Sequence, residues 1–235
     1  MRMIVLLTFL CMLLSCGDDT GGSEAQREVV TPSDSAVAEA VPADTAEMEA
    51  EYSTIEDYGR ITNKEGLVSE FGRENLMEGE SWYAEGTVRF EHTVLTDPGN
   101  GQVITYVWQE DGETLSHIEA EYYIYDEEYL ITGTQEVFSE CGVSTGMSLD
   151  ELREWNRDDF DFLGFGWDYE GGIVEEEGSR IAECPVEIKL SFDLQADLPE
   201  EYTDMYGDRM FSTADEMVQG APVLVDRLTY RHPDQ

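Results

Sequence analysis

Hydrophobic residues recur at two spacings along this chain, and each spacing predicts a different kind of element. Leu149, Leu152 and Trp155 lie three residues apart, which places them on one face of a short helix. Ser148 and Glu151 form the Ser-x-x-Glu pattern of a capping box, in which each side chain bonds the other residue's backbone N–H. We therefore predict a helix that begins after Ser148 and packs its apolar face inward.

An aromatic strand is predicted after this helix, because residues alternate strictly between aromatic and small or acidic from Phe165 to Tyr169. Two interpretations stay open. In the first, the aromatic rings cover the helix and the glycines let another segment approach the opposite face closely. In the second, an aromatic face binds a partner, with Asp168 as its polar anchor. The candidate binding face comprises Trp155, Phe165, Trp167, Asp168 and Tyr169.

Alternating apolar positions predict antiparallel strands in both halves of the chain. In the first half, a helix that starts after Asn63 and ends at Gly72 precedes strands over 82–86, 87–96, 102–108 and 113–125. In the second half, strands are predicted over 143–147, 165–169, 181–192 and 222–230, with one more opening at Val174 and a polar insertion over 195–220.

The two halves read as diverged copies of one unit, because aligning Asn63 with Ser148 places Leu67 on Leu152. We therefore predict an α+β fold of two tandem units, 53–126 and 127–235. Each unit packs a short helical segment on an antiparallel sheet.

The N-terminus has the pattern of an export signal. Arg2 precedes an apolar run over 3–14 that is too short to span a bilayer. Leu13-Leu14-Ser15-Cys16 then resembles a lipobox. The resemblance implies a signal peptide over 1–15, diacylglycerol on Cys16 and a membrane tether; the alternative is a plain secretory leader with a chance cysteine. Asp18 and Asp19 resemble the surface-export signal of bacteria that display outer-membrane lipoproteins outward.

Residues 16–52 have few large apolar side chains and many Ala, Glu, Asp, Ser and Thr residues. Such a segment buries too little surface to offset its ordering entropy, so we predict a disordered acidic linker. Asp34-Ser35-Ala36 and Asp44-Thr45-Ala46 resemble a bacterial O-glycosylation site, which makes Ser35 and Thr45 candidate sugar carriers.

Acidic residues dominate the composition, with 53 Asp+Glu against 13 Lys+Arg and a net charge of −40. Removing Arg2 with the leader leaves 12 basic residues and a charge of −41. A hydrated anionic surface of this kind resists aggregation in salt. Binding to nucleic acid is excluded, because two polyanions repel each other. Cys141 and Cys184 are the cysteines that remain once Cys11 leaves and Cys16 is acylated; an oxidising compartment permits a disulfide, but the sequence does not decide its formation.

The Gly146-Met147-Ser148 segment with Leu152 resembles the repeat of β-lactamase inhibitor proteins, which the small lipoprotein of the outer-membrane β-barrel assembly machinery shares. Residues 71–75 (FGREN) and 164–169 (GFGWDY) resemble a family of uncharacterised two-unit envelope lipoproteins. The resemblance covers about residues 58–192 and implies a fold and an envelope location. Related repeats bind other proteins through a concave sheet face. In that family the helix usually ends Asn-Gly, whereas Asn156 here precedes Arg157.

No catalytic motif or metal-ligand spacing is present around His92, His117 or His232, so we expect no catalysis and no cofactor. The sequence favours a membrane-anchored binding or scaffold module with a protein partner in the envelope. One alternative is an envelope glycan hydrolase that uses paired carboxylates such as Asp161 and Asp168. The other is a purely structural envelope protein.

Overall fold

The structure is a computed structural model that describes residues 52–83, 88–126, 128–166 and 171–233. Several sequence predictions therefore lie outside the described residues: the leader 1–15, the linker up to residue 51, Cys16, Ser35, Thr45, Trp167, Asp168 and Tyr169. The folded part starts at or before Tyr52, whose ring stacks on Tyr58 with the ring centroids 5.0 Å apart.

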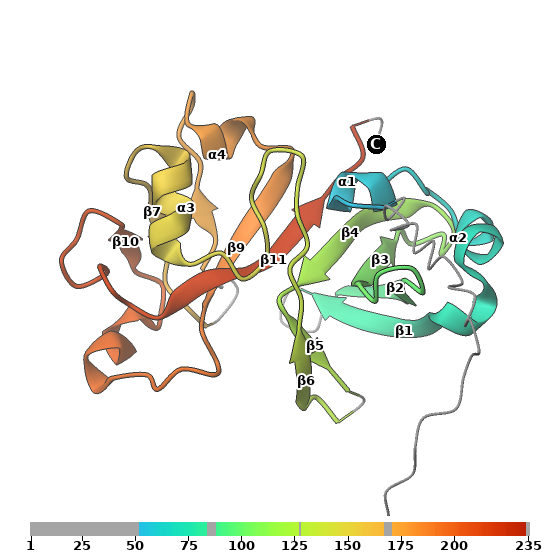
Figure 1. Ribbon diagram of the computed structural model, residues 1–235, viewed down its shortest axis with the longest axis horizontal. Helices are drawn as coiled ribbons and strands as arrows, with labels where there is room; N and C mark the ends of the chain where they lie inside the picture. The colour runs from blue at the N-terminus through green and yellow to red at the C-terminus, as the bar shows by residue number, and fades with distance from the viewer. Residues whose placement is uncertain (1–51, 84–87, 127, 167–170, 234–235) are drawn as a thin grey trace, which may run out of the picture. The chain divides into compact units, whose positions relative to one another are not determined.

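The described chain is mostly antiparallel sheet with a few short helices (Figure 1). The helical segments are α1 Ile55–Tyr58, α2 Lys64–Phe71, α3 Leu149–Asn156, α4 Arg180–Glu183 and the 3-10 turns η1 Arg73–Asn75 and η3 Glu200–Met205. The strands are β1 Leu76–Tyr83, β2 Val88–Thr96, β3 Val103–Trp108, β4 Leu115–Glu121, β5 Tyr123–Tyr125, β6 Ile131–Thr134, β7 Asp161–Leu163, β8 Ile173–Val174, β9 Val186–Phe192, β10 Met210–Ser212 and β11 Val223–Tyr230.

One six-stranded sheet takes strands from both halves of the chain, in the order β1-β2-β3-β4-β11-β9. Every neighbouring pair is antiparallel. Strand β11 joins the halves, because Leu228 pairs with Ala120 of β4 on one side and with Ile188 of β9 on the other. Two smaller sheets have the orders β10-β7-β8 and β5-β6.

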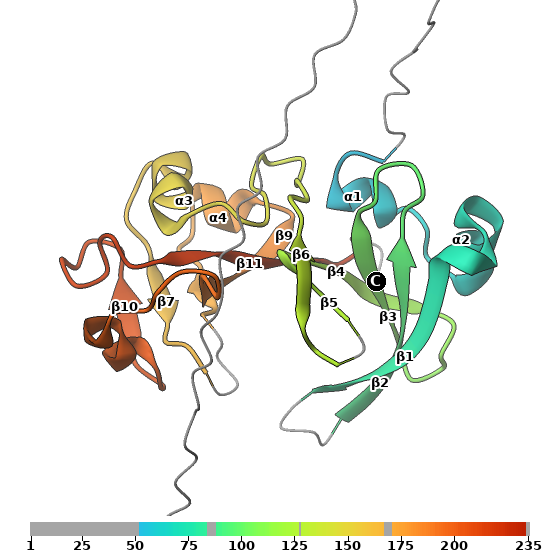
Figure 2. The same cartoon turned by 60° about the horizontal axis from the view of Figure 1, so that its bottom comes forward.

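Helices α1, α3 and α4 lie on the same side of strands β4, β11 and β9 (Figure 2). Helix α1 contacts β4 and β11, and α3 contacts β11. Beneath them, alternate strand residues such as Ile118, Leu228 and Ile188 are buried in a hydrophobic cluster that also contains Ile55 and Leu152. Since side chains alternate across a strand, the residues between these buried positions face the opposite side of the sheet.

Helix α3 forms as predicted. The Ser148 N–H donates to Glu151 Oε2 at 2.8 Å, and the Glu151 N–H donates to Ser148 Oγ at 3.3 Å, so the capping box is complete. The helix ends at Asn156, and the next residue, Arg157, caps it in a left-handed conformation with φ of 67°. The predicted turn over 97–101 and the buried alternation in β9 are also confirmed.

Two predicted strands need correction. Segment 143–147 forms turns and an isolated bridge at Ser144, and the first part of 181–192 is helix α4, because Ser179 Oγ accepts from the Ala182 N–H. Most of the predicted aromatic strand over 165–169 lies outside the described residues; within them, β7 ends at Leu163 and Phe165 forms an isolated bridge with Tyr206. The Gly164 N–H donates to Arg209 O and the Phe165 N–H to Met205 O, so the polar insertion 195–220 occupies the positions that a partner strand would take.

Candidate functional site

Phe165 lies in the core, although the sequence placed it on a candidate binding face. Its side chain is 4% exposed, and its ring centroid is 4.3 Å from that of Phe192 and 5.9 Å from that of Phe162. A ring packed in this way offers almost no surface to a partner. Phe165 is therefore a core residue, and its ring packs against Phe162 and Phe192 of strands β7 and β9, whereas the first interpretation placed the aromatic rings against the helix.

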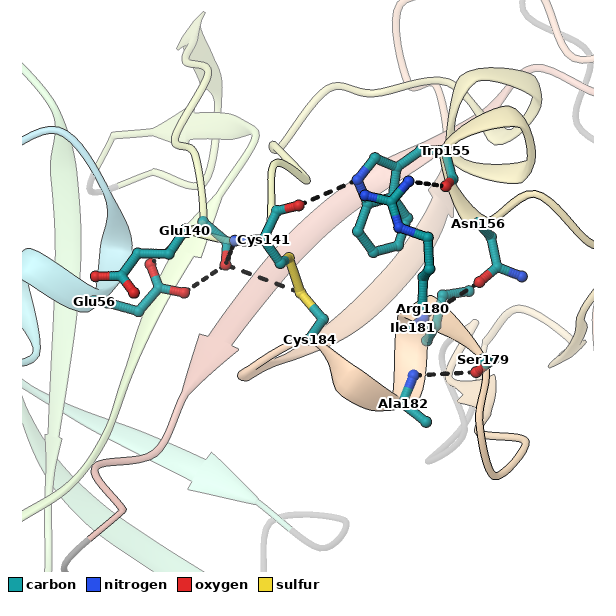
Figure 3. The surroundings of a disulfide bond; sticks show 11 residues. Glu56, Glu140, Cys141, Trp155, Asn156, Ser179, Arg180, Ile181, Ala182 and Cys184 are labelled. Carbon is teal, nitrogen blue, oxygen red and sulfur yellow. Dashed lines mark hydrogen bonds between the residues drawn. A yellow bond between two sulfur atoms is a disulfide. The ribbon is translucent and has the colours of Figure 1, made fainter.

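Trp155 is half-buried beside the loop that carries Cys141 (Figure 3). Its Nε1–H donates to Cys141 O at 3.2 Å, and the guanidinium of Arg180 lies 4.3 Å from its ring centroid. Arg180 also donates to the Trp155 backbone oxygen. These contacts occupy the indole N–H and one ring face, so Trp155 joins α3 to α4 and the Cys141 loop.

Cys141 and Cys184 form a disulfide with their Cα atoms 5.5 Å apart, which decides the pairing that the sequence left open. The adjoining loop is also bound to the first half of the chain (Figure 3). The buried Glu56 of α1 accepts from Ser139 Oγ and from the Glu140 N–H. The disulfide and this carboxylate together hold α1, the 139–141 loop and the end of α4 in contact.

A hollow of about 330 Å³ opens beside the predicted Gly164-Phe165-Gly166 segment. Its walls come from β4, β9 and β11, next to the irregularity between Val225 and Arg227. The lining residues are Glu121, Phe165, Gly166, Lys189, Leu190, Ser191, Phe192, Leu194, Tyr206, Asp226 and Arg227. Tyr206 is 51% exposed, and Leu194 is exposed as well. An aromatic ring and groups of both charges therefore surround one concave surface.

Two glycines allow the chain to build this wall. An added Cβ at Gly164 would lie 2.3 Å from Gly207 O, and one at Gly171 would lie 2.1 Å from Leu190 O. The Leu190 N–H donates to Gly171 O at 3.1 Å, which holds the segment against β9. The predicted close approach is therefore present at Gly164 but not at Gly166, where an added Cβ would lie 3.6 Å from Tyr206; Gly171 was predicted only as part of a turn.

Charged side chains line the sheet face opposite the helices. His117 and Glu119 alternate with the buried Ile118 and Ala120, and His117 Nε2 lies 3.3 Å from Glu119 Oε1. Arg227 Nη1 of β11 lies 3.8 Å from the same oxygen. Burial alone would raise the pKa of Glu119, but the hydrogen bond from His117 and the charges of Arg227 and Lys189 outweigh it and lower this pKa.

The ionised carboxylate of Glu119 and its partners His117 and Arg227 predict that the folded protein loses stability in acid. Because the folded-state pKa of Glu119 is below 4.5, its stabilising contribution is present above pH 4.5 and is lost as pH falls through the folded pKa. Glu119→Gln should lower the free energy of unfolding at pH 7 by roughly 1.5–3 kcal/mol, the range for hydrogen bonds to charged groups. Urea unfolding from pH 3 to 7 measures both effects. A variant whose stability falls as steeply below pH 4.5 as that of the native chain would contradict this assignment.

His92 packs against another glycine, because a Cβ at Gly79 would lie 2.3 Å from His92 Nε2. Burial lowers the pKa of His92, although Glu119, Glu78 and Glu80 oppose the shift.

No cluster of His, Cys, Asp and Glu suited to a metal ion occurs within the described ranges. Of the alternative hydrolase pair, Asp161 lies in β7 and Asp168 is outside those ranges.

The residues of the hollow that sequence reasoning missed come from separate strands. Glu121, Lys189 and Arg227 meet through long-range pairing, since Arg227 opposes Glu121 on one side and Lys189 on the other. None of the helices in the described part of the chain is both long enough and apolar enough to cross a membrane.

Comparison with family models, curated proteins and solved structures found no match to this chain.

Proposed function

We propose that this protein is a lipid-tethered binding module of the cell envelope that contacts a protein partner through the hollow beside Gly164–Gly166. The Leu13–Cys16 lipobox supports a mature N-terminus at an acylated Cys16. The role is contact and not turnover, and it needs no cofactor.

The hollow is the observation that carries this proposal. It adjoins the segment whose sequence was the most distinctive in the chain, and its rim exposes an aromatic ring, Tyr206, beside an aliphatic side chain, Leu194. Exposed tyrosines in concave surfaces are common anchors of protein interfaces. Arg227 Nη1 lies 3.6 Å from Glu121 Oε1, and Lys189 and Asp226 line the same hollow, so a partner segment that carries both charges fits better than a simple anion.

We further propose that the chain consists of two tandem units derived from one ancestor. Helices α2 and α3 have the same length and are capped by the side chains of Asn63 and Ser148. The first strand after each of these helices begins at the same distance from the helix cap, at Leu76 and at Asp161. Strands β4 and β11 pair antiparallel where the two halves meet in the six-stranded sheet, which supports a pseudo-two-fold relation between them.

These features support membership of the two-unit envelope lipoproteins that residues 71–75 and 164–169 resemble. On this proposal the linker spans 16–52 and separates the folded part from the outer membrane, and Ser35 and Thr45 carry sugars. The acidic residues behind Cys16 favour display on the outer surface.

Site-specific photocrosslinking in the producing cells tests the contact. A benzophenone amino acid in place of Tyr206 should give a discrete adduct with one envelope protein. The matched control places the same probe at Trp82, an aromatic residue that is 60% exposed on edge strand β1, where no adduct is expected. Lys189→Glu in the Tyr206 probe background should reduce the adduct, because it reverses one charge of the hollow.

Equal adducts from the two probes would show that the contact is not specific to the hollow. The absence of an adduct from Tyr206, with the protein present at its normal level, would contradict the proposed binding site.

A further inference from the structure

The β5–β6 hairpin carries the aromatic side chain with the highest exposed fraction among the described residues. Tyr129 is 86% exposed and Leu130 is 58% exposed, and the exposed Ile131 and Tyr125 continue the apolar surface onto the strands. Figure 1 shows the hairpin projecting away from β4 and β11. Exposed apolar side chains that cluster at one protruding turn mark an interaction surface more often than single scattered ones do.

The turn holds these side chains in one arrangement. Asp126 Oδ1 accepts from the N–H groups of Glu128 at 2.9 Å and Leu130 at 3.0 Å. The backbone also closes, since the Tyr129 N–H donates to Asp126 O and the Asp126 N–H donates to Leu130 O. Within this turn Tyr129 adopts φ of 59°, which residues with a β-carbon rarely do. The hydrogen bonds of Asp126 fix a conformation that turns the tyrosine ring toward solvent.

Hydrogen bonds also hold the base of the hairpin against the main sheet. The side-chain amide of Gln135 accepts from the Val103 N–H at 2.8 Å and donates to Val103 O at 2.9 Å and to Glu121 O at 2.8 Å. It therefore bonds backbone groups of both β3 and β4. A partner that binds the tip meets a preorganised element, so little ordering entropy is lost on association.

We propose that the tip of this hairpin, Tyr129 with Leu130 and Ile131, is a docking element that inserts into an apolar pocket with a basic rim on a partner protein. The rim chemistry follows from charge, because Asp126 and Glu128 lie beside the apolar side chains. A second copy of this chain is disfavoured by its net charge of −40, and an anionic membrane surface is disfavoured for the same reason.

Photocrosslinking from Tyr129 in the full-length protein, in the cells that produce it, tests this proposal. The crosslinked peptide is identified by mass spectrometry, because capture of a protein is not by itself informative. The expected peptide belongs to one partner and combines apolar residues with Lys or Arg. Leu130→Ser should lower the adduct yield at least about tenfold, and Glu128→Gln should lower it less. The control Met217→Ser, which removes an exposed apolar side chain in the 195–220 insertion, should leave the yield unchanged.

Four results would overturn the proposal: an adduct with lipid, an adduct with a second copy of this chain, an acidic crosslinked peptide, or a yield that Leu130→Ser does not change. Thermal unfolding of each variant verifies folding, and these exposed positions should leave the unfolding temperature nearly unchanged. The hollow is tested separately, because adducts from Tyr206 persist if only the tip assignment fails.

Discussion

Removal of the disulfide by the double substitution Cys141→Ala and Cys184→Ala is expected to lower the free energy of unfolding by about 4 kcal/mol. The bond closes a loop with a sequence separation of 43, and the loop-closure entropy of the unfolded chain gives this magnitude. The loop it closes contains α3 and β7, so the bond constrains the unfolded second half of the chain. Equilibrium unfolding in urea at pH 7 measures the change.

The native chain under reducing conditions is the matched control, because it loses the bond without losing side-chain volume. Its stability should agree with that of the double variant to within about 1 kcal/mol. A loss below about 1 kcal/mol in both would mean that the link from Glu56 to Ser139 and Glu140 holds the loop without the disulfide.

Trp108→Ala is expected to cost about 3–5 kcal/mol, the range for truncating a fully buried large aromatic residue. Trp108 is fully buried in β3, its ring stacks on Tyr106 at 6.1 Å, and its Nε1–H donates to Thr93 Oγ1 at 2.9 Å. The substitution therefore leaves a cavity and removes the donor that Thr93 Oγ1 accepts from. Differential scanning calorimetry and urea unfolding both report the loss.

Trp82→Ala provides the comparison on the same sheet. Because Trp82 is on edge strand β1 and mostly exposed, its removal should change stability by no more than about 0.5 kcal/mol. Comparable losses at the two tryptophans would contradict the assignment of the core to the helix-covered face of the sheet.

Sequence reasoning succeeded where the determinants are local. The capping box of Ser148 and Glu151, the turn over 97–101 and the alternation in β9 each depend on residues within a few positions of one another. Such elements follow from local hydrogen bonds and from the alternation of apolar residues along a strand, and both can be read from neighbouring positions in the sequence.

The candidate site depended on contacts that no local pattern contains. Phe165 became a core residue because the 195–220 insertion supplied Met205 and Gly207 as its backbone hydrogen-bond partners, and the sequence had shown this insertion only as a polar segment. Likewise, pairing of β11 with β4 brought Arg227 to Glu121 across more than a hundred residues of chain. No sequence pattern predicted a role for Lys189, and only the pairing of β11 with β9 shows that it lies opposite Arg227.

The most direct test of a tethered contact module compares the Tyr206 crosslink in cells that carry Cys16 with the crosslink in cells that carry Cys16→Ser, at equal protein levels. Tethering raises the effective concentration of the folded part near an envelope partner, so the adduct should fall at least about tenfold when the lipid is lost. The Cys16 form should also sediment with membranes and carry acyl mass at its first residue. Equal adduct yields from the two forms, or a Cys16 form without acyl mass, would contradict the account.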